Sequence, residues 1–408
     1  MKHNISTFYI SLNEINGEGR DKQEQIKYYV KESIENYGID YVLLIGNEEK
    51  MPVRYSYDSN FSGSPEPFIS DLYYSDIYDA EGHFCSWDSN ENNKFAETKQ
   101  DKESHSTVLL DEVDLYPDVH LGRIPCNNTN ELDIIINKII EYENTIKKPW
   151  FNNMVLFGGN NFPWMVDHLV NFLLKKIYPG YNSHIAWEGE ELCDTVGNIM
   201  NDFSLKKFYA SATMFPYFNK IRNVEKPTAE GINEAINDGA GFVLFSAHGN
   251  PDLVLTYMPF FKRIPIPFPL GYSRYEVQSL QNGKKLPIVV LGSCSGGDFS
   301  TLTGVPSPLG FEFLKLEHGG SIASFCYTSK VWISPGLSHI DTKGGFLEYN
   351  LFKAYNEGIR HPGEMLTKSI TNYLNDDIAL WEAHGDLYIH YGDMQMLSLF
   401  GDPTLQIP

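Results

Sequence analysis

Cysteine is scarce in this chain, which contains only five among its 408 residues. The five are Cys85, Cys126, Cys193, Cys294 and Cys326. Their number is odd, and none forms a CxxC motif or a Cys/His pair with the spacing of zinc ligands. The sequence therefore argues against both a disulfide framework and a structural zinc site.

Long hydrophobic runs are also missing. The most apolar stretches, "YVLLIG", "GFVLFSA" and "PIVVLG", are each the length of a strand and far shorter than a membrane-spanning helix. The first 20 residues contain no apolar segment of the kind that a secretory signal requires. From these absences we expect a cytoplasmic protein with no membrane partner.

Basic residues are in the minority, with 32 Lys and Arg against 53 Asp and Glu, and the formal net charge is −21. Binding to nucleic acid depends on clustered Lys and Arg, so we expect no nucleic-acid partner. The acidity is better explained by solubility. Hydrophobic residues make up 42% of the chain and aromatic residues 14%, which is typical of a folded globular protein.

Strand patterns alternate with amphipathic helical patterns through most of the chain. This alternation predicts an α/β fold in which a mostly parallel sheet is flanked by helices. A helix capped by Thr129 or Asn130 ends before Pro149, and we place a boundary there between two α/β subdomains, 1–148 and 149–408. Residues 56–110 are polar and irregular, as expected of a long insertion or surface loop.

The second half of the chain repeats the strand and helix alternation. A strand over 153–160 precedes a helix over about 164–177, and a second helix runs from a Thr228 cap to Gly239. Further helices are predicted at about 308–318, 345–357 and 363–375, with a strand in "GSIASFCY".

Two apolar strands in this half end in residues that suit catalysis. "GFVLFSAHG" ends in His248, and "PIVVLGSCSGG" ends in Cys294. Ligands and catalytic groups gather at the carboxyl ends of parallel strands, so adjacent strands would bring the imidazole and the thiol into one crevice. A single His or Cys at such a position is more often structural, but the pair predicts a nucleophile with its acid/base. Gly296 and Gly297 would leave room for a substrate carbonyl.

The chemistry predicted for this pair is acyl transfer. The Cys294 thiolate would attack a peptide carbonyl to form a thioester, and His248 would protonate the leaving amine and then activate water. Backbone N–H groups of Gly249 and Cys294 are the candidate donors to the oxyanion. No cofactor or metal is required.

Six short stretches carry a family resemblance and follow one another in the family's order. They are "YVLLIGN", "DLYYSD", "PDVHLGRIP", "SAHGNPD", "GSCSGGDF" and "LFGDPTLQI". Together they resemble the gingipain family of cysteine peptidases, within the caspase-like clan, from about residue 40 to the end. The resemblance implies a caspase-like catalytic subdomain over 149–408, with Cys294 as nucleophile and His248 as its partner. It also implies that Trp332 lines the specificity pocket, where the alternative is an ordinary buried aromatic residue.

The chain departs from the family in places. Where gingipains carry a glutamate that steadies the histidine, "VLFGGNNF" offers Asn160 or Asn161, and an asparagine can orient an imidazole by a hydrogen bond. Asp167, the nearest candidate for an arginine-selecting acid, has a spacing that also fits a solvated helix residue. Family members carry structural calcium in places, and Asp76, Asp79 and Asp114 are weak calcium candidates in a segment that fits a solvated acidic loop better.

The sequence therefore predicts a cysteine endopeptidase that performs limited proteolysis of a protein or peptide substrate. A catalytically silent caspase-like scaffold and a transpeptidase with the same nucleophile are the alternatives. A reactive thiolate inside a cell is a hazard, so we expect activity to be restrained by a regulatory partner, by a covering loop such as 250–275, or until self-cleavage of the chain.

Overall fold

The computed structural model describes residues 5–58, 66–100, 107–145, 148–160, 188–213, 216–256, 271–305, 307–332, 343–384 and 391–408. These residues form a central sheet with eight strands and three smaller sheets. In order across the central sheet, the strands are β1 (Tyr41–Ile45), β6 (His120–Ile124), β15 (Leu397–Phe400), β14 (Ala323–Tyr327), β13 (Ile288–Gly292), β9 (Phe242–Ser246), β7 (Asn153–Gly158) and β8 (Ser204–Tyr209). All neighbours pair in parallel except β14 and β15.

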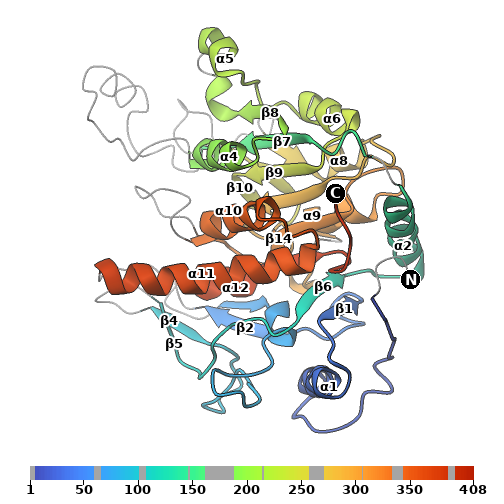
Figure 1. Ribbon diagram of the computed structural model, residues 1–408, viewed down its shortest axis with the longest axis vertical. Coiled ribbons are helices and arrows are strands. Elements are labelled where there is room, and N and C mark those ends of the chain that lie inside the picture. The colour runs from blue at the N-terminus through green and yellow to red at the C-terminus, as the bar shows by residue number, and fades with distance from the viewer. Residues whose placement is uncertain are drawn as a thin grey trace.

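Helices cover both faces of this sheet, and the predicted α/β fold is confirmed. The described helices are α1 (Lys22–Tyr37), α2 (Thr129–Asn144), α4 (Glu188–Ile199), α5 (Pro216–Arg222), α6 (Ala229–Asp238), α8 (Arg274–Gln278), α9 (Leu309–Lys315), α10 (Lys343–Asn356), α11 (Pro362–His384) and α12 (Tyr391–Met396). Figure 1 shows α4, α10 and α11 lying across the near side of the sheet. On the other face, α9 packs on β13, β14 and β15 and lies beside α2 and α8.

Strands in the middle of the sheet are buried along their whole length. Every residue of β9, β13, β14 and β15 is buried, as expected of strands covered by helices on both faces. Burial of a Val, Leu, Ile or Phe side chain contributes roughly 1.5–3 kcal/mol, so these strands form a rigid base. The residues that follow their carboxyl ends are therefore held in fixed positions.

Smaller elements surround this core. The three-stranded sheet contains β10 (His248–Asn250), β11 (Leu253–Leu255) and β12 (Gly271–Ser273). Two hairpins are β2 (Tyr55–Asp58) with β3 (Glu66–Ile69) and β4 (Thr98–Gln100) with β5 (Thr107–Leu109). Short 3-10 helices are η1 (Asp71–Tyr74), η2 (Ala210–Thr213) and η3 (Thr301–Thr303).

The central sheet crosses the boundary predicted at residue 148. The C-terminal strand β15 lies between β6 from the first subdomain and β14 from the second. Its neighbour Gly401 also donates its N–H to the Arg123 carbonyl at 2.9 Å. The two proposed subdomains therefore share one sheet, and the last strand of the chain is the element that joins them.

Two local expectations differ from the structure. The helix predicted to be capped by Thr129 or Asn130 is capped one residue earlier, where the Asn128 side chain accepts from the Glu131 N–H. Within the segment expected to be a polar insertion, Tyr73 and Trp87 are fully buried. Both rings belong to the main hydrophobic core, and the Lys27 ammonium of α1 lies 4.4 Å from the centre of the Tyr73 ring, so this polar stretch is packed against the rest of the fold.

Candidate active site

Three neighbouring strands end at the same level of the sheet. Gly158 of β7 pairs with Ser246 of β9, and Ser246 pairs with Gly292 of β13. Asn160, His248 and Cys294 each follow the last paired residue of their strand by two positions. The parallel register therefore brings these three residues, which are far apart in sequence, to one edge of the sheet.

The segment with His248 packs directly against the segment with Cys294. A Cβ atom at Gly249 would lie 2.7 Å from the Cβ of Ser293, so only a glycine fits there. The Ala247 N–H also donates to the Gly292 carbonyl at 3.2 Å. Contacts on both sides of His248 thus fix its backbone beside Cys294.

The backbone around Cys294 forms a tight turn. Ser295 has a φ of 56°, in the left-handed region that a residue with a side chain seldom adopts. Its N–H donates to the Ser329 carbonyl at 2.8 Å, which holds the turn. A Cβ at Gly297 would lie 2.6 Å from the sulfur of Cys326. Gly297 therefore allows close packing with the core, rather than making room for a substrate as expected from the sequence.

Cys294 differs from the other cysteines in exposure. All five are free thiols, and Cys294 is half-buried whereas the others are buried. Burial raises the pKa of the Cys294 thiol, and the negative charge of Asp393 raises it further. The thiol also donates a weak hydrogen bond to the Val331 carbonyl, with the sulfur 3.7 Å from the oxygen, and this bond requires the protonated form. The resting thiol therefore needs a base to become a nucleophile.

Trp332 lies next to this contact, because it directly follows Val331. It is partly exposed, and its backbone N–H donates a hydrogen bond to the Asp393 carboxylate of α12 at 3.0 Å. The ammonium of Lys343 lies 5.9 Å from the centre of the Trp332 ring. The position beside Cys294 agrees with the pocket-lining role that the sequence predicts for Trp332, which remains a prediction.

Comparison with known proteins defines the family. The profile of peptidase family C25 matches residues 2–408. This chain belongs to peptidase family C25. Membership implies a cysteine peptidase, and the gingipain resemblance predicted from the short stretches is confirmed.

Solved structures of gingipains share the fold of this C25 chain. The crystal structure of the Arg-specific cysteine proteinase gingipain R has a TM-score of 0.56 and 16% identity, and the match covers 94% of this chain and 68% of that one. The complex of the pro- and mature domains of RgpB from Porphyromonas gingivalis has a TM-score of 0.55 and 16% identity, with 94% and 69% covered.

A curated relative from Archaeoglobus fulgidus, described as an uncharacterized protein, is 22% identical over 274 residues. The match covers 64% of this C25 chain and 56% of the relative. This chain therefore spans about half the length of that relative.

Glu188, an acidic residue that the sequence pattern did not single out, lies beside the ends of β7 and β9 in this C25 chain. It begins α4 and is 9% exposed. The next residue, Gly189, donates its N–H to the Gly159 carbonyl at 3.2 Å, and a Cβ on Gly189 would overlap the Ser246 carbonyl oxygen. The start of α4 therefore rests on the ends of β7 and β9. The signal in the sequence was "WEGEE", a glycine between acidic residues at the start of a helix.

Glu190, two residues further along α4, has other hydrogen-bond partners. Its carboxylate accepts hydrogen bonds from the Ser211 N–H and hydroxyl, both at 2.7 Å, and from Arg222 at 2.9 Å. These partners belong to η2 and α5, beyond the end of β8. Of the two buried glutamates at the start of α4, Glu188 is thus the candidate for contact with the histidine side of the site.

The two asparagines of the sequence analysis fare differently. Asn160 is fully buried, and its N–H donates to the Thr256 hydroxyl at 2.6 Å. Asn161 lies outside the described residues, as do Asp167, the helix predicted over 164–177 and residues 257–270 of the predicted covering loop. Of the two asparagines, the structure describes only Asn160, which lies at the same edge of the sheet as His248 and Cys294.

The weak calcium candidates are used for local hydrogen bonds. Asp76 accepts from the indole N–H of Trp87 at 2.7 Å, and Asp79 and Asp114 accept backbone N–H bonds from residues close in sequence. Among the described residues, no group of three or more His, Cys, Asp or Glu side chains is placed to hold a metal ion. Structural calcium remains an untested prediction.

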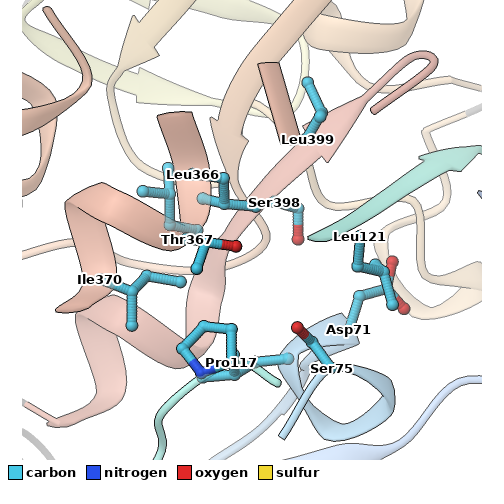
Figure 2. A pocket seen from close by; sticks show the side chains of 11 residues that line it. Asp71, Ser75, Pro117, Leu121, Leu366, Thr367, Ile370, Ser398 and Leu399 are labelled. Atoms are coloured by element: carbon cyan, nitrogen blue, oxygen red, sulfur yellow. The ribbon is translucent and has the colours of Figure 1, made fainter. Parts of the chain in front are cut away.

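A cleft lies away from this edge of the sheet in the C25 chain. Figure 2 shows it between η1, β6, α11 and β15, where Asp71, Leu121, Thr367 and Ser398 line it. Neither His248 nor Cys294 contributes to it.

In the part of the chain that the structure describes, no helix combines the length and apolar character needed to cross a membrane.

Proposed function

We propose that this chain is a cysteine endopeptidase with Cys294 as nucleophile and His248 as acid and base, acting on a protein or peptide substrate. The observation that carries the proposal is the shared register of β9 and β13, which places both residues two positions beyond paired strand ends. The contact between Gly249 and Ser293 supports it, because that contact holds the two segments together.

The proposed reaction begins when His248 removes the thiol proton and the Cys294 sulfur attacks the scissile carbonyl carbon. Backbone N–H groups of Gly249 and Cys294 stabilise the oxyanion, and one such donor typically contributes about 2.7–4 kcal/mol to the transition state. The C–N bond then breaks, and the amine leaves with the proton from His248. Water attacks the thioester while His248 takes its proton, the C–S bond breaks to release the acid product, which ionises to a carboxylate, and the Cys294 sulfur regains the proton from His248.

Orientation of His248 is assigned to one of two buried residues. Glu188 supplies a carboxylate at the start of α4, and Asn160 supplies an amide from the end of β7. A carboxylate also stabilises the imidazolium that forms during the reaction, whereas an amide fixes only the tautomer and ring orientation. We therefore favour Glu188, with Asn160 as the alternative.

The test uses peptidyl acyloxymethyl ketones that carry Arg, Lys, Asp or Leu at the recognition position. In these probes a thiolate displaces the carboxylate and leaves a thioether, which mass spectrometry of the intact protein detects. We expect labelling of the wild type that is lost in Cys294→Ala and strongly reduced in His248→Ala. The strongest probe would also identify the side chain that the pocket prefers.

A negative result would favour the silent scaffold. It would consist of no labelling by any probe, with Cys294 as slow toward iodoacetamide as the buried Cys85 and Cys126. Cleavage assays with an added amine distinguish hydrolysis from transpeptidation, because an amine that resolves the thioester appears in the product.

A further inference from the structure

A group of buried residues holds the chain segment next to the proposed nucleophile, and none of them takes part in the reaction described above. Asp393 on α12 is fully buried, and its carboxylate accepts a hydrogen bond from the backbone N–H of Trp332 at 3.0 Å. Trp332 follows Val331, whose carbonyl accepts from the Cys294 thiol. A short chain of contacts thus runs from α12 through this segment to the sulfur.

The start of α10 holds the same segment from the other side. The Gly344 N–H donates to the Trp332 carbonyl at 3.1 Å, and the Tyr327 hydroxyl donates to the Gly344 carbonyl at 3.0 Å. Residues 331 and 332 are therefore fixed through both the N–H and the carbonyl of Trp332. Without Asp393, the Trp332 N–H would lose the buried acceptor that fixes one side of it.

Charge is concentrated at this place. The Glu348 carboxylate of α10 is buried and packs against Gly292, where an added Cβ would overlap it. Lys343, at the start of α10, lies over the Trp332 ring. The charged groups that act on the Cys294 thiol are Asp393 on α12 and Lys330 after β14, and Asp393 itself interacts with Lys343 and Glu348 of α10. His248 follows the neighbouring strand β9.

We propose that Asp393 is a positioning residue of the Cys294 site. Its contact with the Trp332 backbone holds Val331 and Trp332 in place beside the sulfur, and its negative charge adds to burial in favouring the protonated thiol. The two roles have different requirements, because the first needs only a hydrogen-bond acceptor whereas the second needs the charge. The raised pKa of the Cys294 thiol agrees with the second role. This inference rests on the proposed function only in making Cys294 the nucleophile.

Two variants of Asp393 separate the roles. Asp393→Asn keeps an acceptor for the Trp332 N–H and removes the charge, so the midpoint of the pH profile for iodoacetamide alkylation of Cys294 should fall by about 0.5–1 pH unit. Asp393→Ala removes the acceptor as well, so labelling by the preferred peptidyl probe should fall about 10-fold relative to alkylation by iodoacetamide. The Asn variant should restore most of that loss.

Asp111→Asn is the matched control. Asp111 is also a buried carboxylate that accepts backbone N–H bonds, from Ser89 at 3.0 Å and Glu97 at 3.1 Å, and it belongs to the hairpin region of the first subdomain. The control should leave the alkylation profile of Cys294 unchanged. Thermal melting of all variants shows whether each is folded.

Either of two results would overturn the proposal. An unchanged alkylation midpoint in a folded Asp393→Asn variant would remove the electrostatic role, and wild-type peptidyl labelling in Asp393→Ala would remove the positioning role. Alkylation does not require peptidase activity. A shifted midpoint in a protein that no peptidyl probe labels would therefore support the role of the Asp393 charge while contradicting the proposed function.

Discussion

At the scale of single residues, the site depends on close approach between two backbone segments. Gly249 touches Ser293 so closely that a methyl group has no space, and both residues are neighbours of the proposed catalytic pair. A small displacement there changes the distance between the imidazole and the sulfur. Such displacements are costly for catalysis even when they cost little stability.

Gly249→Ala should therefore reduce peptidyl probe labelling of Cys294 by about 10-fold to 100-fold, because the new Cβ pushes the two segments apart. Its thermal midpoint should change much less than its activity. Gly17→Ala is the control, since an added Cβ at Gly17 meets no atom within 4 Å. Full labelling of Gly249→Ala would show that the two segments tolerate separation.

Glu188→Gln tests which residue orients His248. The change keeps the size of the side chain and removes the charge. If the Glu188 carboxylate stabilises the imidazolium, kcat should fall by about 100-fold or more. Asn160→Ala should have the smaller effect. The reverse order, with Glu188→Gln nearly fully active and Asn160→Ala inactive, would transfer the orienting role to Asn160.

At the scale of helices and strands, one side chain links the two proposed subdomains. Lys138 of α2 is 8% exposed and donates to the carbonyls of Leu314, Leu316 and Gly319, at 2.8, 3.1 and 2.8 Å. These carbonyls lie at and beyond the end of α9. The last carbonyls of a helix have no backbone donor within that helix, so they need partners from elsewhere. Lys138 therefore caps α9 from another helix.

Lys138→Met should lower the free energy of unfolding by roughly 3 kcal/mol, because three carbonyl acceptors lose their buried donor. Urea unfolding followed by circular dichroism measures the change. Lys284→Met is the control, since Lys284 is 72% exposed and pairs with Glu141 on the same α2 helix at the surface. A change below about 0.5 kcal/mol is expected for the control. Equal values for both variants would contradict the capping role.

The sequence was most informative about these elements where patterns are local. Unbroken apolar runs predicted β9 and β13, and the residue types at their ends predicted His248 and Cys294. Thr228 caps α6, which ends before Gly239, as expected. The cap of α2 was misplaced by one or two residues because Asn128, Thr129 and Asn130 are all polar residues that can cap a helix.

Residues that reach the site by tertiary packing could not be predicted in this way. Glu188, Glu348 and Asp393 each lie more than 50 residues from Cys294 in sequence, and no local pattern shows which acidic residues the fold brings to the sheet edge. Their positions follow from how α4, α10 and α12 cover the sheet. That packing depends on the whole chain, whereas a strand end depends on its immediate neighbours.

At the scale of the whole molecule, buried carboxyl groups make stability depend on pH. Burial raises the pKa of Glu190 from its ordinary value of 4.5 to about 7. The folded protein therefore binds a proton more readily than the unfolded chain between these values, and this contribution to stability is lost as the pH rises through about 7. Asp76 has the same sign, because burial raises its pKa to about 7.

Glu190→Gln should remove its share of this dependence. In urea unfolding at pH 5 and pH 8, the difference in free energy between the two conditions should be smaller in the variant than in the wild type by roughly 2 kcal/mol. Asp76 is present in both proteins, so its contribution cancels. An identical difference in both proteins would mean that Arg222 keeps Glu190 ionised at both pH values.

The position of β15 has a consequence for the order in which the molecule is made. This strand lies in the interior of the central sheet, between β6 and β14, although its residues follow both of those strands in the sequence. Until those residues are synthesised, β6 and β14 have no partner on their facing edges. The sheet is therefore completed only after β15 has been made, and the contacts that close it join residues far apart in sequence, which is the kind of pairing that folds slowly.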